Sequence, residues 1–356
     1  MIETKKVQLK GMTLPELKEW FIKKGEKSFR GEQVFNWMYN YLVDDADQML
    51  NLSKSLRELI KNETIINTLE LTDKSVSGSE GTVKLLLKTA LDHLIECVII
   101  PEEKRCTLCV STQVGCPLDC KFCATGLLGY KRNLTAGEIF DQYAIAQSIY
   151  ERDITNIVYM GMGEPLLNFD STVKSLEIFQ QELTKGISLK KITVSTAGIA
   201  PRIRDLADTG LRPKLALSLH SCFEDIRTKI MPINAKYSLK ENIEAIEYYI
   251  KKTNTRITYE YTMLEGINDR DKDIKALGKL CRRMPSKVNI IPFNSLEHMN
   301  PEGFSGELRS TSRERIEEFA DRLRDEYVTV MVRDTQGDEI AAACGQLAGV
   351  TIRSHE

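Results

Sequence analysis

Five of the nine cysteines in this chain of 356 residues lie close together, between Cys106 and Cys123. Within that stretch Cys116, Cys120 and Cys123 follow the spacing Cys-x3-Cys-x2-Cys, and thiolates on one loop are the usual ligands of an iron–sulfur cluster. Three ligands to a four-iron cluster leave one iron with an open position, where a reactant can bind. The sequence therefore indicates a metal site that takes part in chemistry.

A zinc site is the alternative. Cys106-x2-Cys109 and Cys120-x2-Cys123 are two pairs whose separation is near that of a four-thiolate zinc knuckle. That assignment leaves Cys116 without a role, so the spacing favours the iron–sulfur interpretation. Five buried and inert cysteines are less favoured still, because thiols this dense seldom lack a function.

The composition is that of a soluble globular protein, with 42% hydrophobic and 28% charged residues. No apolar stretch reaches about 18 residues, so we expect no membrane association. The first residues lack the apolar run of a signal peptide. We therefore expect a cytoplasmic protein, in which nine cysteines indicate metal binding, redox chemistry or burial.

The net charge of −2 does not indicate a nucleic-acid-binding protein. Any binding of RNA must depend on local groups of basic residues, and each such group is also typical of a solvated face. The candidates are Lys23, Lys24, Lys27 and Arg30; Lys104 and Arg105; Lys131 and Arg132; and Arg282 and Arg283.

The elements that must position these residues follow from hydrophobic periodicity. Helical spacing covers Leu14–Lys24, Arg30–Leu42 and Ser53–Lys61, and Thr13 with Glu16 is typical of a helix start. Two β-rich runs, Thr82–Lys88 and His93–Ile100, then predict a hairpin.

Beyond residue 105, strands and helices alternate, which predicts a parallel sheet with right-handed crossovers. Six such units are too few for a closed eight-stranded barrel, so an open, partial barrel and a doubly wound sheet are the two options. The expected strands are Thr107–Ser111, Ile154–Met160, Lys191–Ser195, Lys214–Ser218, Arg256–Met263, Val288–Ile291 and Val328–Val332. The expected helices are Thr135–Tyr150, Ser171–Leu183, Ala200–Thr209, Leu239–Lys251, Asp271–Met284 and Ser312–Asp325.

The cysteine motif, with Phe122 before its last cysteine, resembles the signature of radical S-adenosylmethionine enzymes. Gly161-Met-Gly163-Glu164-Pro165 follows the second strand of the alternating series and is similar to the glycine-rich motif of the same enzymes. Alone this segment is weak, since glycines after a strand are more often turns. It supports the resemblance only because of its position relative to the cysteine motif.

Further motifs narrow the resemblance to the RlmN family of adenine carbon-2 methyltransferases. They run from about residue 14 to residue 349, nearly the whole chain. They are Phe29-Arg30-x2-Gln33-x3-Trp37, Cys116-Pro-Leu-Asp-Cys-Lys-Phe-Cys-Ala-Thr-Gly126, Arg132-Asn-Leu-Thr-Ala-Gly-Glu138, Gly161-Met-Gly-Glu-Pro-Leu-Leu-Asn168, Ser218-Leu-His220, Met231-Pro-Ile-Asn234, Ile291-Pro-Phe-Asn294 and Ala343-Cys-Gly-Gln-Leu-Ala-Gly349.

The resemblance implies an α/β fold, a partial (β/α)6 TIM-like barrel of the radical S-adenosylmethionine type. It implies an N-terminal helical accessory domain that contacts RNA and a β-hairpin extension. The expected domains are residues 1–65 for the helical domain, 66–104 for the hairpin extension, 105–335 for the barrel and 336–356 for a C-terminal segment.

The resemblance also implies cofactors and the residues that bind them. Cys116, Cys120 and Cys123 would hold a 4Fe–4S cluster, and two molecules of S-adenosylmethionine would be used per turnover. The residues expected to bind S-adenosylmethionine are Gly163, Glu164, Ser195, Ser218, Leu219, His220 and Asn294. Taken singly, each of the polar groups at predicted strand ends could also cap a helix or satisfy a loop.

Two further cysteines carry the distinctive chemistry of the family. Cys344, in the small-residue stretch Ala341-Ala-Ala-Cys344, would become methylated and would link covalently to the RNA. Cys109 would resolve that adduct through a transient disulfide with Cys344, and Glu96 would accept a proton. From the pattern alone, Glu96 is an outward-facing strand residue and Cys344 a small buried hydrophobe.

The implied substrates are an adenosine in the peptidyl transferase centre of 23S rRNA and an adenosine beside the anticodon of tRNA. The implied electron donor is a flavodoxin or ferredoxin, and we expect a monomer. A Cfr-like branch that methylates adenine carbon 8 is the nearest alternative, and it differs by an alanine in place of Pro165. A zinc-knuckle RNA-binding protein without catalysis is the remote alternative. Cys97, Cys222 and Cys281 are expected to serve packing, and Cys106 has no assigned role.

Overall fold

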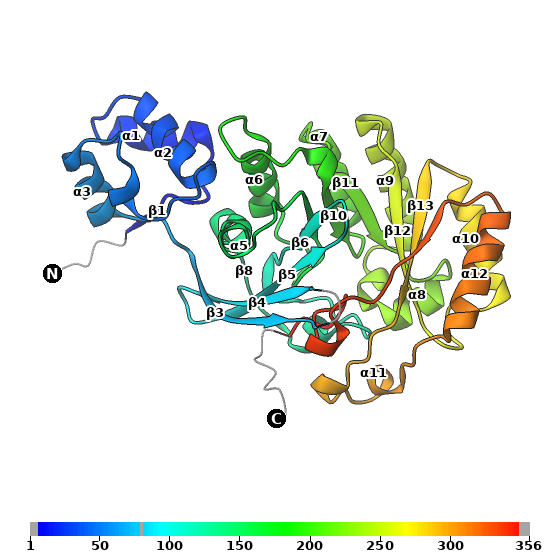
Figure 1. Cartoon of the computed structure of the whole chain (residues 1–356). Coiled ribbons are helices and arrows are strands. Elements are labelled where there is room, and N and C mark those ends of the chain that lie inside the picture. The colour runs from blue at the N-terminus through cyan, green and yellow to red at the C-terminus, as the bar shows by residue number, and fades with distance from the viewer. Residues whose placement is uncertain (1–5, 79–80, 349–356) are drawn as a thin grey trace.

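The computed structural model describes residues 6–78 and 81–348 (Figure 1). The outermost parts of the expected terminal domains and Gly349, the last residue of the C-terminal motif, lie outside the described residues. Within those ranges, no helix is both long and apolar enough to cross a membrane.

Three helices form the N-terminal region, as the sequence predicts. They are α1 (Leu14–Lys23), α2 (Phe29–Tyr39) and α3 (Lys54–Glu63). Thr13 begins α1, and its backbone N–H donates a hydrogen bond to the Glu16 carboxylate at 2.8 Å, which is the expected capping interaction. Strands β1 (Val7–Gln8) and β2 (Thr64–Ile65) pair in parallel and join the two ends of this region.

A ten-stranded sheet forms the body of the molecule, in the order β14-β13-β12-β11-β10-β9-β6-β5-β4-β3. The neighbours from β6 to β14 are parallel, and β5, β4 and β3 continue the sheet as an antiparallel extension. The parallel strands are β6 (Cys106–Cys109), β9 (Asn156–Tyr159), β10 (Ile192–Thr196), β11 (Lys214–Ser218), β12 (Ile257–Met263), β13 (Ser286–Pro292) and β14 (Val330–Val332). The antiparallel strands are β3 (Leu69–Val76), β4 (Val83–Thr89) and β5 (Leu94–Pro101).

The predicted strands agree with the observed strands to within two residues at each end. The parallel strands stand in chain order without a reversal, and a doubly wound sheet requires such a reversal. The doubly wound option is therefore wrong. β14 and β3 are the edges of the sheet in the described part of the chain, so the sheet is open.

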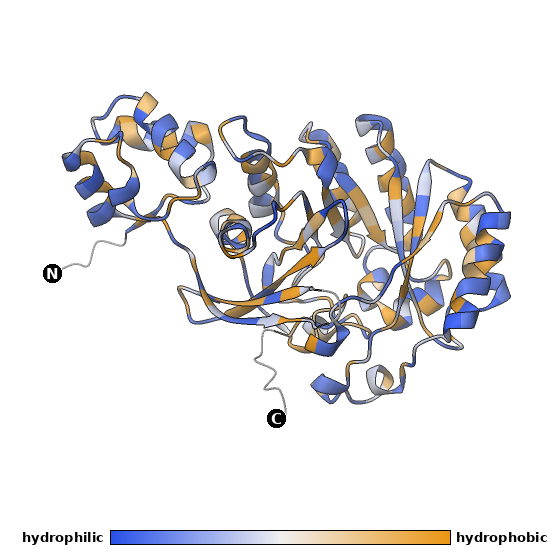
Figure 2. Ribbon diagram, viewed as in Figure 1, coloured by the Kyte–Doolittle hydropathy of each residue, from blue (hydrophilic) through white to orange (hydrophobic). Residues whose placement is uncertain are grey.

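The helices between the strands form an outer layer around the sheet (Figure 1). The predicted ones are confirmed as α5 (Ala136–Ile149), α6 (Phe169–Gln180), α7 (Ala200–Asp208), α9 (Leu239–Thr253), α10 (Asp271–Cys281) and α12 (Arg313–Asp325). Hydrophobic residues are concentrated in the strands, whereas much of α12 is hydrophilic (Figure 2). The core therefore lies between the sheet and this helical layer.

The two faces of the sheet differ in chemistry. The side chains that point to the helices are apolar or aromatic and fully or almost fully buried, among them Leu108, Ile157, Val194, Leu217, Tyr259 and Ile290. Residues paired across neighbouring strands point to the same face, and so do residues two apart along one strand. By this pairing the opposite, inner face carries Glu96, Cys109, Ser195, Ser218 and Glu260.

The sequence missed β3 and several short elements. β3 reads Leu-Glu-Leu-Thr-Asp-Lys-Ser-Val and is mostly exposed, because it is an edge strand that needs little apolar surface. The predicted hairpin, β4 and β5, is thus two strands of a three-stranded extension whose edge strand is β3. The other missed elements have two to seven residues, too few for a periodic signal: β7 (Gln113–Gly115), α4 (Ala124–Leu127), β8 (Tyr130–Asn133), α8 (Glu224–Ile230), α11 (Phe304–Glu307) and the short β1 and β2.

A buried ion pair joins the N-terminal region to α5. Lys10 Nζ lies 2.5 Å from a carboxylate oxygen of Asp141, and neither side chain is more than 2% exposed. The same carboxylate accepts a hydrogen bond from the backbone N–H of Thr68 at 2.8 Å. Because the desolvated charges depend on each other, removal of one leaves the other buried without compensation.

Replacement of Lys10 by methionine is expected to lower the free energy of unfolding by about 3–5 kcal/mol, since the Asp141 carboxylate stays buried. Urea denaturation measures this loss. Lys18→Met is the matched control, because Lys18 and Glu32 form a partly exposed pair that should contribute less than about 1 kcal/mol. Equal losses in the two variants would contradict the prediction.

Candidate active site

The three cysteines of the Cys-x3-Cys-x2-Cys motif lie on one loop between β7 and α4. Backbone hydrogen bonds hold this loop at Cys116 N–H to Gly129 O (3.0 Å) and at Lys121 N–H to Ile230 O (2.9 Å). Gly115 enters the loop at φ +71°, and a Cβ there would lie 1.8 Å from Gly129 O, so the turn requires glycine. The loop geometry is therefore fixed on both sides.

The thiols of Cys116, Cys120 and Cys123 all line one cavity, which we call the cofactor cavity. Burial raises the pKa of Cys116 to about 12 and that of Cys120 well above its usual value. Thiols in such a place become thiolates when they ligate a cationic metal. This donor set fits an iron–sulfur cluster, in which each thiolate binds a different iron.

The zinc-knuckle alternative is wrong. Cys106 and Cys109 are three residues apart on β6, so their side chains point to opposite faces of the sheet. Cys106 is buried among apolar residues, away from the cofactor cavity. In the described part of the chain, no three His, Cys, Asp or Glu side chains are placed to hold a single metal ion.

Glu164 lies inside the cofactor cavity with both carboxylate oxygens engaged. They accept hydrogen bonds from the backbone N–H groups of Ala197 (2.7 Å) and Leu166 (3.0 Å). Burial raises the pKa of Glu164 to about 7, against the effect of these hydrogen bonds. An ammonium group bound beside Glu164 would favour its charged form, so the site suits the amino end of an amino acid.

Gly163 allows the segment that carries Glu164 to lie close to Gln113. It has φ +97°, and a Cβ at this position would lie 2.5 Å from the Cβ of Gln113. The Gln113 side chain in turn accepts the backbone N–H of Glu164 at 2.8 Å. The glycine thus permits a close approach between two segments that form the wall of the cavity.

The carboxyl ends of three parallel strands supply further lining residues. Ser195 on β10, Ser218 on β11 and Asn294 just after β13 all line the cofactor cavity, as the sequence predicts. Leu219 does not line it. Its side chain is fully buried in the core, and its backbone N–H donates to Glu260 O.

His220 is a neutral donor at the wall of this cavity. Its Nδ1 accepts the backbone N–H of Thr262 at 2.9 Å, so the proton of the neutral ring lies on Nε2. Burial, with a smaller effect of Arg227, lowers its pKa to about 3. The ring packs edge-on against Phe122 of the cysteine loop, with centroids 4.5 Å apart.

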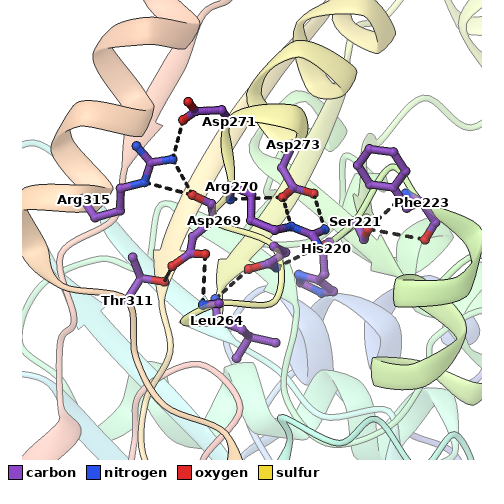
Figure 3. Close-up of polar contacts among 12 residues, drawn as sticks. His220, Ser221, Phe223, Leu264, Asp269, Arg270, Asp271, Asp273, Thr311 and Arg315 are labelled. Atoms are coloured by element: carbon purple, nitrogen blue, oxygen red, sulfur yellow. Dashed lines mark hydrogen bonds and ion pairs between the residues drawn. The ribbon is translucent and has the colours of Figure 1, made fainter.

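The loop after β12 holds His220 through a network of hydrogen bonds (Figure 3). Asn268 Nδ2 donates to His220 O at 2.7 Å, and its Oδ1 accepts the N–H of Leu264. Arg315 on α12 holds the same loop through the carbonyl oxygen of Asp269. His220 also adopts a left-handed backbone at φ +53°, which this network maintains.

The C-terminal segment carries Cys344 across the inner face of the sheet (Figure 1). Asn294 Nδ2 donates to Cys344 O at 3.0 Å, and Gly345 O accepts the N–H of Ala124 at 2.7 Å. These contacts hold the main chain on both sides of the cysteine. The Cys344 side chain is exposed and lines the cofactor cavity.

A second cavity shares Cys344 with the first. We call it the thiol cavity, because Cys109 and Cys344 both line it. Burial, followed by the neighbouring Cys344 thiol, raises the pKa of Cys109 to about 12. The shared wall of the two cavities also contains Met160, Glu260, Ile291, Asn294 and Gly345.

Glu96 is buried, not outward-facing as its pattern suggests. It is 1% exposed and lies 3.2 Å from Lys84 Nζ. Its carboxylate accepts the backbone N–H of Ala348 at 2.8 Å. The expectation was wrong because the C-terminal segment, distant in sequence, covers this face of β5.

All nine cysteines are free thiols in the described residues, so a standing disulfide between Cys109 and Cys344 is not supported. Cys97 is fully buried in the apolar core, and Cys281 is almost fully buried there. Cys222 is half-buried against the same core. The packing interpretation of these three residues agrees with their surroundings.

Glu260 is a lining residue that sequence reasoning missed. It is 4% exposed on the wall shared by the two cavities, and Asn289 Nδ2 donates to one of its oxygens at 2.9 Å. The signal was available, since Glu260 is the one charged residue in the strand Ile257–Met263. A carboxylate within a strand whose other residues are all uncharged indicates a face that is not packed.

Two models of known protein families match parts of this chain. Residues 110–277 match the family model of the radical SAM superfamily, and residues 7–66 match that of the ribosomal RNA large subunit methyltransferase N-terminal domain.

The similarity to individual proteins extends over nearly the whole chain. The chain is 42% identical over 355 residues to a probable dual-specificity RNA methyltransferase RlmN of Salinibacter ruber, covering 96% of this chain and 94% of that protein. It is 41% identical over 355 residues to the dual-specificity RNA methyltransferase RlmN of Pseudomonas fluorescens, covering 97% and 91%. A crystal structure of a radical SAM methyltransferase from Sphaerobacter thermophilus superposes with a TM-score of 0.90 at 37% identity, covering 97% and 100%.

Gly163→Ala is expected to weaken the binding of S-adenosylmethionine at least tenfold, because the added Cβ displaces Gln113 and with it Glu164. Equilibrium dialysis with labelled ligand on the reconstituted protein measures the affinity, and iron content should be unchanged. Gly210→Ala is the control, since it has a comparable φ of +78° but no atom within 4 Å of the new Cβ. Equal affinities in both variants would contradict this role of Gly163.

Proposed function

The chain belongs to the RlmN family of radical SAM RNA methyltransferases, and from this premise we propose that it methylates carbon 2 of adenosine in two RNAs. The proposed substrates are an adenosine in the peptidyl transferase centre of 23S rRNA and an adenosine beside the anticodon of tRNA. Membership in the superfamily implies a 4Fe–4S cluster and S-adenosylmethionine. We propose that two molecules of the latter are used per turnover.

One observation carries the proposal. Cys344 lies on the wall between the cavity with the three cluster cysteines and the cavity with Cys109. A side chain in that place can receive a group from a ligand on one side and deliver it to a base on the other. A methyl-carrying cysteine needs this position, whereas a packing cysteine does not.

The chemistry explains why a carrier is needed. An adenine ring carbon that bears hydrogen is not a nucleophile, so direct displacement at S-adenosylmethionine fails there. When bound, the cluster and S-adenosylmethionine would supply a methyl cation equivalent and a radical that abstracts hydrogen from carbon. The Cys344 sulfur first attacks the methyl group, S-adenosylhomocysteine leaves and the thiol proton is lost, which gives S-methylcysteine. After the radical has removed one hydrogen atom from that methyl group, its carbon bonds to the adenine carbon, which links Cys344 to the RNA.

Cys109 is assigned to release the product. Its thiolate attacks the Cys344 sulfur, the carbon–sulfur bond breaks, and the released carbon takes up a proton to complete the methyl group, which leaves a disulfide between the two cysteines. The one electron in excess from the radical step would return to the cluster. The two-electron reduction of that disulfide needs an external thiol reductant, as a reducing cytoplasm supplies. The thiol cavity supports this role, because it contains both sulfurs.

Glu96 is proposed as the acceptor of the proton that leaves the adenine carbon. Two observations support it. Glu96 shares the inner face of the sheet with Cys109, and its carboxylate contacts the C-terminal segment four residues beyond Cys344. Its ion pair with Lys84 holds the carboxylate at this place on the sheet.

We also propose a division of the chain into domains, an electron donor, an oligomeric state and a cellular location. We assign residues 1–65 to an RNA-contacting helical domain, 66–104 to an extension, 105–335 to a partial (β/α)6 barrel and 336–356 to the C-terminal segment. The chain order of the parallel strands supports the barrel. A flavodoxin or ferredoxin is the proposed electron donor, and the protein is proposed to act as a cytoplasmic monomer.

Methylation at carbon 8 is the competing assignment. Pro165 and the segment from Gly337 to Cys344 resemble the carbon-2 branch of the family. Pro165 itself lines the cofactor cavity, and its carbonyl oxygen accepts the hydroxyl of Thr172 on α6 at 3.0 Å. The position that separates the two branches is therefore part of the cavity wall.

RNA from cells that express the protein is expected to contain 2-methyladenosine at the target positions of 23S rRNA and tRNA. Mass spectrometry of the nucleosides measures it, with RNA from cells that lack the enzyme as the control. The appearance of 8-methyladenosine instead would overturn the carbon-2 assignment. Methylation of only one RNA would overturn the dual specificity.

Cys109→Ala is expected to accumulate a covalent protein–RNA adduct, because no thiolate remains to attack the Cys344 sulfur. The adduct is measured as a band that survives denaturing electrophoresis and disappears on nuclease digestion. Cys344→Ala is the control and should form neither adduct nor product while it keeps its iron content. Normal turnover of Cys109→Ala would disprove the resolving role.

A further inference from the structure

Four basic side chains stand on the inner face of the sheet, one from each of the neighbouring strands β11 to β14. They are Lys214, Arg256, Lys287 and Arg333, which we call the basic row. Arg256 directly precedes β12 and Arg333 directly follows β14.

The strand register places all four on the face that carries Cys109. Lys214 pairs with Thr193, which pairs with Val158, the partner of Cys109. Lys287 pairs with Thr258, two residues from Arg256. Met331, two residues before Arg333, pairs with Asn289, two residues beyond Lys287. Residues related in this way share a face.

None of the four side chains forms an ion pair or a hydrogen bond with another described residue. Most basic residues in groups contiguous in sequence behave differently, although Lys27, Lys104 and Lys131 form no ion pair with another described residue. Lys23, Lys24, Arg105, Arg132, Arg282 and Arg283 are each within an ion pair. The basic row is therefore a group of cations on one face of the sheet with no ion pair of its own among the described residues.

Assembly of this row costs stability. Like charges on neighbouring strands repel, and a sheet normally avoids them. Burial and then Arg256 and Arg105 lower the pKa of Lys214. Burial also lowers the pKa of Lys287, and the other three members of the row add to this effect. One buried carboxylate, Glu260, faces the row and offsets part of the charge. A surface that retains such repulsion is typical of an anion-binding site.

The row is accessible and continuous with the reaction site. Lys214 and Arg256 are exposed, and Lys287 and Arg333 are half-buried. Arg333 lines the thiol cavity together with Cys109 and Cys344. Strand spacing of about 4.8 Å places Lys214, Arg256 and Lys287 across roughly 10 Å, and Arg333 lies further along, at the level of Ile291 by register. This length is enough for more than one phosphate of a strand.

We propose that the basic row binds the phosphate groups of the RNA strand that carries the target adenosine. This inference rests on the proposed function, and it assigns the surface along which the substrate reaches Cys344. Phosphate contacts position a strand without reading its sequence, which suits an enzyme that acts on two different RNAs. The target base can then leave its stack and enter the thiol cavity.

The test compares the wild-type enzyme with the triple variant Lys214→Gln/Arg256→Gln/Lys287→Gln, which leaves Arg333 and the thiol cavity intact. Fluorescence anisotropy gives the affinity for a labelled RNA hairpin that contains the target adenosine, at several salt concentrations. We expect at least tenfold weaker binding at low salt. We also expect a plot of log affinity against log salt that is shallower by about 2, since each single-strand phosphate contact contributes about 0.7.

The control variant Lys240→Gln/Lys251→Gln/Lys275→Gln removes the same charge from exposed residues of α9 and α10 on the other side of the sheet. It should keep the wild-type affinity and slope. Mass spectrometry of Cys344 methylation by S-adenosylmethionine without RNA checks that the row variant still folds and binds its cofactors. This half-reaction should be unchanged.

An unchanged affinity and slope in the row variant would overturn the inference while the proposed function stands. Failure of the wild-type enzyme to bind the hairpin would instead overturn the proposed function. If the triple variant loses Cys344 methylation, the salt dependence of RNA binding is measured on the three single variants instead. Each should lower the slope by about 0.7, and three unchanged slopes would overturn the inference.

Discussion

The alternation of side chains along a β-strand is the constraint on which the rest of this structure depends. Helices cover one face of the sheet, so every strand must send apolar residues such as Ile157, Tyr259 and Ile290 to that side. Polar and reactive residues are then confined to the other face. Glu96, Cys109 and Ser218 belong to different strands and are far apart in sequence, yet this rule brings them to one surface. A one-residue slip in any strand would bury its polar set under the helices.

An open inner face needs a cover, and the C-terminal segment provides one while it also carries Cys344. Its main chain is held by Asn294 at Cys344 O, by Ala124 at Gly345 O and by Glu96 at the N–H of Ala348. These anchors come from the last part of the sheet, the cysteine loop and the antiparallel extension. Because they bind the backbone and not the thiol, the sulfur stays available to both cavities. The position of Cys344 is thus coupled to the loop that would hold the cluster.

The sequence predicts what periodicity and spacing can encode. Each parallel strand and long helix has a buried side, and that side repeats every two residues or every three to four. β3 lacks this periodic signal because an exposed edge strand needs few apolar residues. The cysteine loop also lacks it, because its path depends on a single turn at Gly115. The error on Glu96 has a different cause, since its burial is decided by a segment about 250 residues away. The pair Cys106 and Cys109 looks like a metal motif until the strand is known, and then the alternation separates the two thiols.

The net charge does not show how charge is distributed over the folded protein, because the fold brings together residues that are distant in sequence. A value of −2 sums charges over the whole chain, whereas a binding surface depends on the charges that the fold brings together. The basic groups contiguous in sequence lie largely beside acidic partners, which compensate them locally. The basic row is assembled by strand register from residues between Lys214 and Arg333, and Glu260 offsets only part of its charge. Repulsion within the row is a cost paid on folding, and bound phosphates would remove it. Part of the affinity for RNA therefore comes from relief of strain already present in the free protein, so the row variants should bind RNA less tightly and unfold less readily.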